Sequence, residues 1–99
     1  MTDPLGQVQI IGIAWYLQQD YPAILNIMAD ADLLPASFEK WQYQVHRLER
    51  DIRASGKVVV RAVIDPATFP EWCRSRDLNV DSKARRAFAN DHAYRHGRH

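Results

Sequence analysis

The sequence has almost no cysteine: Cys73 is the only one in 99 residues, so no disulfide can form within the chain. Small secreted domains usually depend on several disulfides, whereas proteins of a reducing compartment do not. A long apolar run is also missing. The stretch from Val8 to Leu17 is interrupted by Gln9 and Gly12 and has no basic residue before it, so it fits neither a signal peptide nor a membrane span. We therefore expect a cytoplasmic protein that has no membrane partner.

Patterns that mark common active sites are missing as well. The chain has no glycine-rich phosphate loop, no G-x-S-x-G elbow and no C-x-x-C pair. Cys73 is a candidate reactive thiol, because it lies near the start of an expected helix, where a thiol ionises more easily. It also lies four residues after Phe69 on an apolar face, which favours a buried structural role. We expect no enzyme activity and no cofactor.

Candidate metal ligands are few. His92 and His96 have the i,i+4 spacing that can hold zinc on a helix, and His99 follows, but the glycine after His96 indicates that the helix has ended. Asp30 and Asp32 form an acidic pair without the glycine turn and distant glutamate of a calcium loop. We interpret these groups as a tail and a solvated loop, and predict no metal site.

The composition is that of one globular domain. Apolar residues make up 46% of the chain and charged residues 25%, and three Trp, four Tyr and three Phe supply large side chains for a core. A length of 99 residues fits a single domain. We expect a flexible arm at residues 1–6, a globular domain at residues 7–93 and a frayed basic tail at residues 94–99.

Two segments are typical of β-strands. Residues 7–17 are rich in Ile, Val and aromatic residues, although their spacing also suits a helix. Residues 57–65 hold four Val and one Ile and indicate a strand covered on both faces, apart from Arg61. Helices are expected at residues 20–29, 37–55, 68–76 and 81–93, with Asp20 and Asp81 capping the first and last.

The element order is then β-α-α-β-α-α. Two strands joined by a long helical crossover should lie parallel. We predict a small single α/β domain in which a two-stranded, parallel sheet is packed by amphipathic helices. The alternative is a mostly α-helical domain, in which residues 7–17 are a helix.

The clearest helix runs from Ser37 to Ser55. Its apolar residues recur at spacings of three, four, three and four, which places them in one stripe that should face the core. Gly56 ends it, as glycine does just past a last turn. The stripe consists of Phe38, Trp41, Val45, Leu48 and Ile52.

A short pattern occurs twice, as PASFEKW at residues 35–41 and PATFPEW at residues 66–72. Thr68 and Glu71 match the capping box, and Ser37 can cap the other helix. The flanking sequences do not match, so a duplicated repeat is not indicated. We interpret the pattern as two helix starts with similar chemistry, each burying one Phe/Trp pair.

Charge is distributed unevenly. Residues 1–46 hold five acidic and one basic residue, whereas residues 47–99 hold seven acidic and twelve basic ones. Phe88 and Tyr94 lie among the basic residues near the C-terminus, so phosphates and bases are candidate ligands there. The candidate nucleic-acid patch consists of Arg76, Lys83, Arg85, Arg86, Arg95 and Arg98.

Several segments together resemble a family of small bacterial proteins with no assigned function: IAWY, DYP, SFEKW, VIDPATFPEWC and ARRAFAN. The resemblance covers residues 10–90. It implies a compact bacterial cytoplasmic domain and brings no catalytic residue with it.

Two functional hypotheses follow. The first is a non-catalytic protein-interaction module that binds an unknown protein or a second copy of itself, because a two-stranded sheet leaves edges that need cover. The alternative is an accessory protein that binds nucleic acid weakly and without sequence preference through its basic C-terminal helix and tail.

Overall fold

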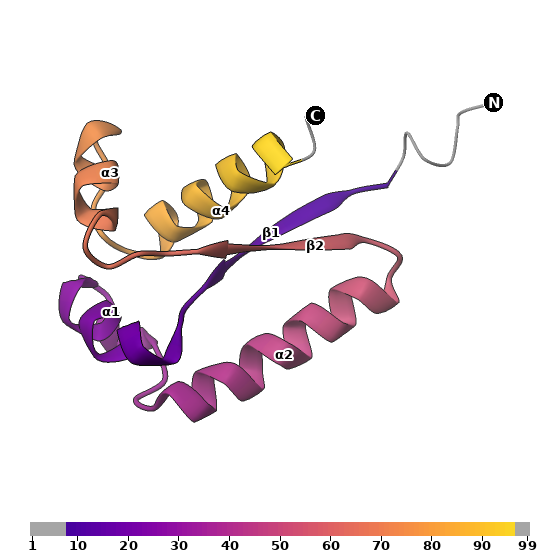
Figure 1. Ribbon diagram of the computed structural model, residues 1–99, viewed down its shortest axis with the longest axis horizontal. Helices are drawn as coiled ribbons and strands as arrows, with labels where there is room; N and C mark the ends of the chain where they lie inside the picture. Colours follow the sequence, from indigo (N-terminus) through magenta and orange to yellow (C-terminus); the bar gives the residue numbers. More distant parts are fainter. Residues whose placement is uncertain (1–7, 97–99) are drawn as a thin grey trace.

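A computed structural model describes residues 8–96 (Figure 1). The arm predicted at residues 1–6 and the final residues 97–99 lie outside the described residues. The strands and helices follow the predicted order β-α-α-β-α-α, with two short 3-10 turns added. The elements are β1 (Ile10–Trp15), η2 (Gln18–Asp20), α1 (Tyr21–Ile27), η3 (Ala31–Leu33), α2 (Phe38–Ala54), β2 (Val58–Val63), α3 (Phe69–Ser75) and α4 (Ser82–His96).

The two strands form a parallel two-stranded sheet, which confirms the predicted α/β class. Ile10 lies opposite Val58 and Trp15 lies opposite Val63. The strands point the same way because α2 carries the chain back between them. Both strands are shorter than the sequence indicated.

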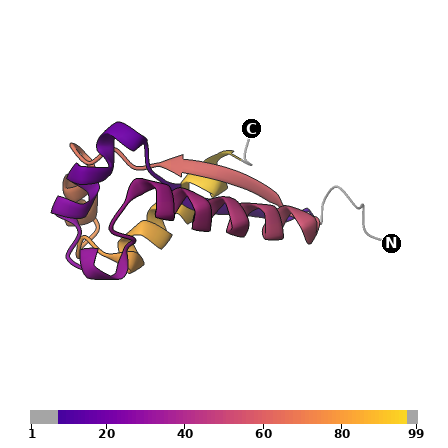
Figure 2. The ribbon, with the colours of Figure 1, turned by 90° about the horizontal axis from the view of Figure 1, so that it is seen from below.

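Helices cover both faces of the sheet, with α4 on one side and α2 on the other (Figures 1 and 2). The contact of α4 with β1 is unusually close: a β-carbon on Gly12 would lie 2.1 Å from the carbonyl oxygen of Ala89. The buried residues of α4 are Ala84, Ala89 and Ala93, and such small side chains let a helix backbone approach a strand.

Aromatic side chains form two clusters. At the C-terminal end of β1, the ring of Trp41 lies 5.4 Å from Trp15 and 4.8 Å from Tyr16. In a second cluster, formed by α3 and α4, Trp72 stacks on Phe69 with ring centres 5.8 Å apart, and Phe88 meets both rings edge-on. The two Phe/Trp pairs of the repeated pattern thus belong to different clusters.

The long helix α2 begins as predicted, because the Ser37 hydroxyl accepts the N–H of Lys40 at 3.2 Å. The predicted apolar stripe is wrong at one position. Leu48 is 49% exposed, whereas Glu49 is only 3% exposed. Glu49 turns inward because Arg61 of β2 binds both of its carboxylate oxygens, at 2.8 and 2.9 Å.

The predicted capping box at the start of α3 is wrong. The Thr68 side chain makes no capping hydrogen bond, and Glu71 pairs with Arg74 instead. Asp65 organises this turn, since its carboxylate accepts the N–H of Ala67 at 2.9 Å and its carbonyl oxygen accepts the N–H of Phe69 at 2.9 Å. An aspartate that bonds the backbone two residues on is a common way to start a turn.

The caps of the other two helices differ from each other. The Asp20 side chain makes no capping hydrogen bond at α1, so that prediction is wrong. The Asp81 carboxylate accepts the N–H groups of Lys83 and Ala84 at 3.1 and 3.3 Å, which confirms the predicted cap of α4. This helix continues to His96, so the end expected at residue 93 is three residues too early.

Candidate functional site

The outer edge of β1 has unpaired backbone groups. Val58 and Ile64 donate to the carbonyl oxygens of Gln9 and Trp15, so odd-numbered residues of β1 face β2. The N–H and C=O groups of Ile10, Gly12 and Ala14 therefore point the other way. Within residues 8–96 no other strand or loop bonds to them. This edge is open to a further strand.

The β1 edge also has no charge to protect it. Residues 8–19 contain neither a charged residue nor a proline, and the pairing with β2 runs without a bulge. Natural edge strands usually carry such features, because they prevent unwanted pairing. Strand β2 differs, since Arg61 lies at its centre and Lys57 and Asp65 flank it.

A hollow of about 220 Å³ lies between β1 and α2. Leu48 and Gln44 form its exposed rim on the helix, and Ile13 and Ala14 form its floor on the strand. No residue of β2 lines it, so it opens on the free side of β1. The lining residues are Ile13, Ala14, Trp41, Gln44, Val45 and Leu48. We call this hollow, together with the outer edge of β1, the β1–α2 surface.

The rim of the hollow continues along α2 as a row of exposed residues. Lys40, Gln44, Leu48 and Asp51 follow one another at spacings of four, four and three, which places them on one side of the helix. Helix α2 runs antiparallel to β1, since its C-terminal end leads into β2, which starts opposite Ile10. Lys40 thus lies near the C-terminal end of β1 and Asp51 near its start.

A charged pair fixes α2 against the sheet beside this surface. The Arg61 guanidinium, bound to Glu49, lies over the ring of Trp15 with its carbon 4.0 Å from the ring centre. The hydrogen bonds from Arg61 lower the pKa of the Glu49 carboxyl below its usual value. Because three elements meet in this contact, it holds the rim of the hollow in a fixed position.

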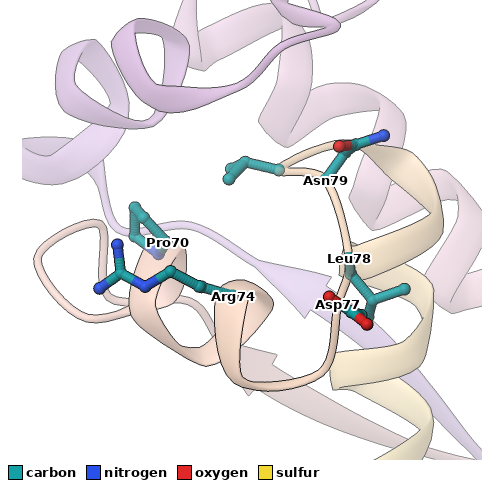
Figure 3. A pocket seen from close by; sticks show the side chains of 6 residues that line it. Pro70, Arg74, Asp77, Leu78 and Asn79 are labelled. Carbon is teal, nitrogen blue, oxygen red and sulfur yellow. The ribbon is translucent and has the colours of Figure 1, made fainter.

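A second hollow, of about 450 Å³, lies between α3 and the segment that leads into α4 (Figure 3). Arg74 and Asp77 flank it, and Arg74 pairs with Glu71 at the surface. Asp77 has a φ of 59°, a left-handed conformation that aspartate tolerates. The lining residues are Pro70, Arg74, Asp77, Leu78, Asn79 and Val80. The charged groups on this hollow are exposed, so we assign no chemistry to it.

The candidate nucleic-acid patch loses a central member. Arg85 forms two hydrogen bonds to the Asp30 carboxylate, at 2.8 and 3.0 Å, and its side chain is only 11% exposed. The prediction that Arg85 belongs to an accessible patch is therefore wrong. The same contact corrects the prediction for Asp30, which joins η3 to α4 instead of lying in a solvated loop. These hydrogen bonds lower the pKa of the Asp30 carboxyl.

The other patch residues do not all have a free guanidinium or ammonium group. Arg76 lies over the Trp72 ring at 4.3 Å, and Arg95 pairs with Asp91 at 3.2 Å. Lys83 and Arg86 are exposed on α4, and Arg98 lies outside the described residues.

Cys73 is fully buried, and burial raises the pKa of its thiol. A raised pKa disfavours the thiolate that nucleophilic chemistry needs. His92 stacks on Phe88, and within residues 8–96 no cluster of three His, Cys, Asp or Glu side chains could hold a metal ion. None of the helices in this range is long and apolar enough to cross a membrane.

No protein-family model, curated protein or solved structure matches the chain. The resemblance to a bacterial family thus stays a prediction.

Sequence reasoning missed the β1–α2 surface because it placed Leu48 in the core. One signal could have pointed to the surface: the uncharged stretch of residues 8–19 around a predicted strand.

Proposed function

We propose that this protein is a small, non-catalytic, cytoplasmic protein-interaction module that binds its partner at the β1–α2 surface. One observation carries the proposal. A regular strand with open backbone groups and no charge borders an apolar hollow whose rim residue, Leu48, is 49% exposed. Proteins that recognise extended peptides often combine a free strand edge with adjoining side-chain pockets.

The structure gives the surface the rigidity that recognition needs. Ala89 presses against β1 at Gly12, and the Glu49–Arg61 contact holds α2 over Trp15. A preformed surface loses little conformational freedom on binding, so more of the contact energy appears as affinity.

A selection from a displayed library of random peptides of about ten residues, long enough to span a strand of average length, tests this proposal. We expect binders whose affinity falls at least about tenfold, or 1.4 kcal/mol, in the variant Leu48→Asp. Leu33→Asp is the matched control, because Leu33 is 75% exposed on η3 and does not line the hollow. Circular dichroism should show both variants folded.

Two outcomes would count against this function: a selection that yields no binder, or binders that tolerate Leu48→Asp and lose affinity in Leu33→Asp.

The nucleic-acid alternative has less support, since Arg85 is paired with Asp30. It predicts low-salt binding to short DNA or RNA that weakens steeply with added salt. Salt-sensitive binding to DNA or RNA that is unaffected by Leu48→Asp would favour the alternative.

A further inference from the structure

We infer that the β1–α2 surface takes one extended segment of a partner, antiparallel to β1, with an uncharged middle, an acidic residue near its amino end and a basic residue near its carboxyl end. This inference rests on the proposed function and specifies its partner. Four features of the surface carry it: the direction of the free backbone groups, the width of the space, the absence of charge and the charges at the two ends.

The free groups set the form of the ligand. Ile10, Gly12 and Ala14 each present one N–H and one C=O along the outer edge, at the two-residue interval of a strand. Only another extended backbone has donors and acceptors at the same interval. Antiparallel pairing is slightly more stable per residue than parallel pairing, and parallel sheets often have an antiparallel edge strand.

The width of the space beside the outer edge of β1 favours a single extended segment over a second copy of this chain. Helix α4 packs directly on β1, with Ala89 against Gly12, whereas α2 reaches the strand through side chains such as Val45, which lines the hollow with Ile13. A helix about 10 Å wide overhangs the strand beneath it by about 5 Å, which is one strand spacing. A second copy paired through β1 would bring its own α4 into the same space, because α4 lies on β1 in each copy. A segment without helices fits.

The charge of the surface sets the middle of the ligand. Residues 8–19 are uncharged, and the hollow beside them is lined by apolar side chains and one amide, Gln44. A charged side chain placed there would lose water without gaining a partner. The middle of the segment should therefore carry small, apolar or hydroxyl side chains.

The charged residues at the two ends of the exposed row on α2 determine which end of the bound segment is acidic and which is basic. Lys40 lies near the C-terminal end of β1, which is where the amino end of an antiparallel segment would lie, and Asp51 lies near the other end. At about 1.5 Å per residue, the two are about 16 Å apart along the helix, which matches about five residues of extended chain. An acidic and a basic residue about that far apart would meet Lys40 and Asp51 respectively.

The peptides selected on the wild-type protein provide the first test. Their aligned sequences should show an uncharged middle with an acidic residue before it and a basic residue after it. In the double variant Lys40→Glu with Asp51→Lys, affinity for these peptides should fall about tenfold, and peptides with the two end charges exchanged should bind better. The control is Asp32→Lys with Lys83→Glu, a reversal of two exposed charges elsewhere that also leaves the net charge unchanged.

A second test asks whether the peptide pairs as a strand. A methyl group on alternate peptide nitrogens removes the donors on one edge. Methylation of one alternating set should abolish binding, and methylation of the other set should change it less than about twofold, because only one edge faces β1.

Three results would overturn the inference. They are peptides that bind through Leu48 but lack the charge order, equal sensitivity to both methylation patterns, and a dimer in sedimentation that Leu48→Asp dissociates. The first two leave the proposed function intact, and the third assigns the surface to a second copy. If the selection yields no Leu48-dependent binder, the proposed function and this inference fail together.

Discussion

Gly12 and Ala89 touch backbone to backbone: a β-carbon on Gly12 would lie 2.1 Å from the Ala89 carbonyl oxygen and 3.1 Å from the β-carbon of Ala93. The strand that we propose as the binding edge is therefore also the strand on which α4 rests. A side chain at position 12 must push α4 away from the sheet, because the nearest atom belongs to a helix backbone.

We predict that Gly12→Ala destabilises the fold by about 1–3 kcal/mol, the range for overpacking a close contact. Urea unfolding followed by circular dichroism measures the change. Gly56→Ala is an informative comparison, since Gly56 has open space around it but a φ of 90°. Its cost should come from backbone strain alone, of about 1 kcal/mol. Equal stability of Gly12→Ala and the wild type would contradict the close packing of α4 on β1.

The buried carboxylate of Glu49 gives a second prediction. Glu49→Ala removes both hydrogen bonds to Arg61 and should cost about 2–3 kcal/mol, because bonds between charged groups are the stronger kind. Arg53→Ala should cost less than about 0.5 kcal/mol, since the Arg53 side chain is 54% exposed and lies 3.4 Å from Glu49. If the two variants lose similar stability, the account of why Glu49 is buried is wrong.

Acid should weaken the fold. Hydrogen bonds from Arg61 lower the pKa of Glu49, and those from Arg85 lower the pKa of Asp30. A lowered pKa in the folded state means that this stability is complete above the unfolded values, about 4, and is lost as the pH falls through the lower folded values. We expect the urea midpoint to fall from about pH 5 downward. In Glu49→Gln the decline should be shallower, and an unchanged pH profile in this variant would count against the paired carboxylate.

Substitutions at two residues of the predicted stripe should change the stability of the fold by different amounts. Trp41 is 7% exposed and contacts four other aromatic residues, so Trp41→Ala should cost about 3–5 kcal/mol. Leu48 is 49% exposed, so Leu48→Ala should cost less than about 1 kcal/mol. Thermal unfolding of both variants checks this. A large loss in Leu48→Ala would place Leu48 in the core and remove it as a binding residue.

Local chemistry was enough to predict much of the fold. Ser37 and Gly56 mark the ends of α2, the valines mark β2, and the long helical crossover requires parallel strands. These features depend on neighbouring residues or on general rules for how strands and helices connect. A single amino-acid sequence is therefore enough to predict them.

Contacts between distant residues could not be predicted in this way. Glu49 is buried because Arg61 lies across from it, and Arg85 is removed from the surface because Asp30 binds it. The face of α4 that meets the sheet is made of alanine, so its pattern of hydrophobicity is weak and gave no hint of its place over Gly12. The exposure of Leu48, which defines the candidate site, follows from the inward turn of its neighbour Glu49.

Hydrogen exchange at single backbone amides, measured by NMR with and without a selected peptide, tests the proposed binding surface most directly. The amides of Ile10, Gly12 and Ala14 face the open edge, so binding should slow their exchange, while the amides of Val59 and Arg61 at the far edge of the sheet should exchange as before. Unchanged exchange at the three β1 amides, with slowing at α3 or α4 instead, would contradict the account.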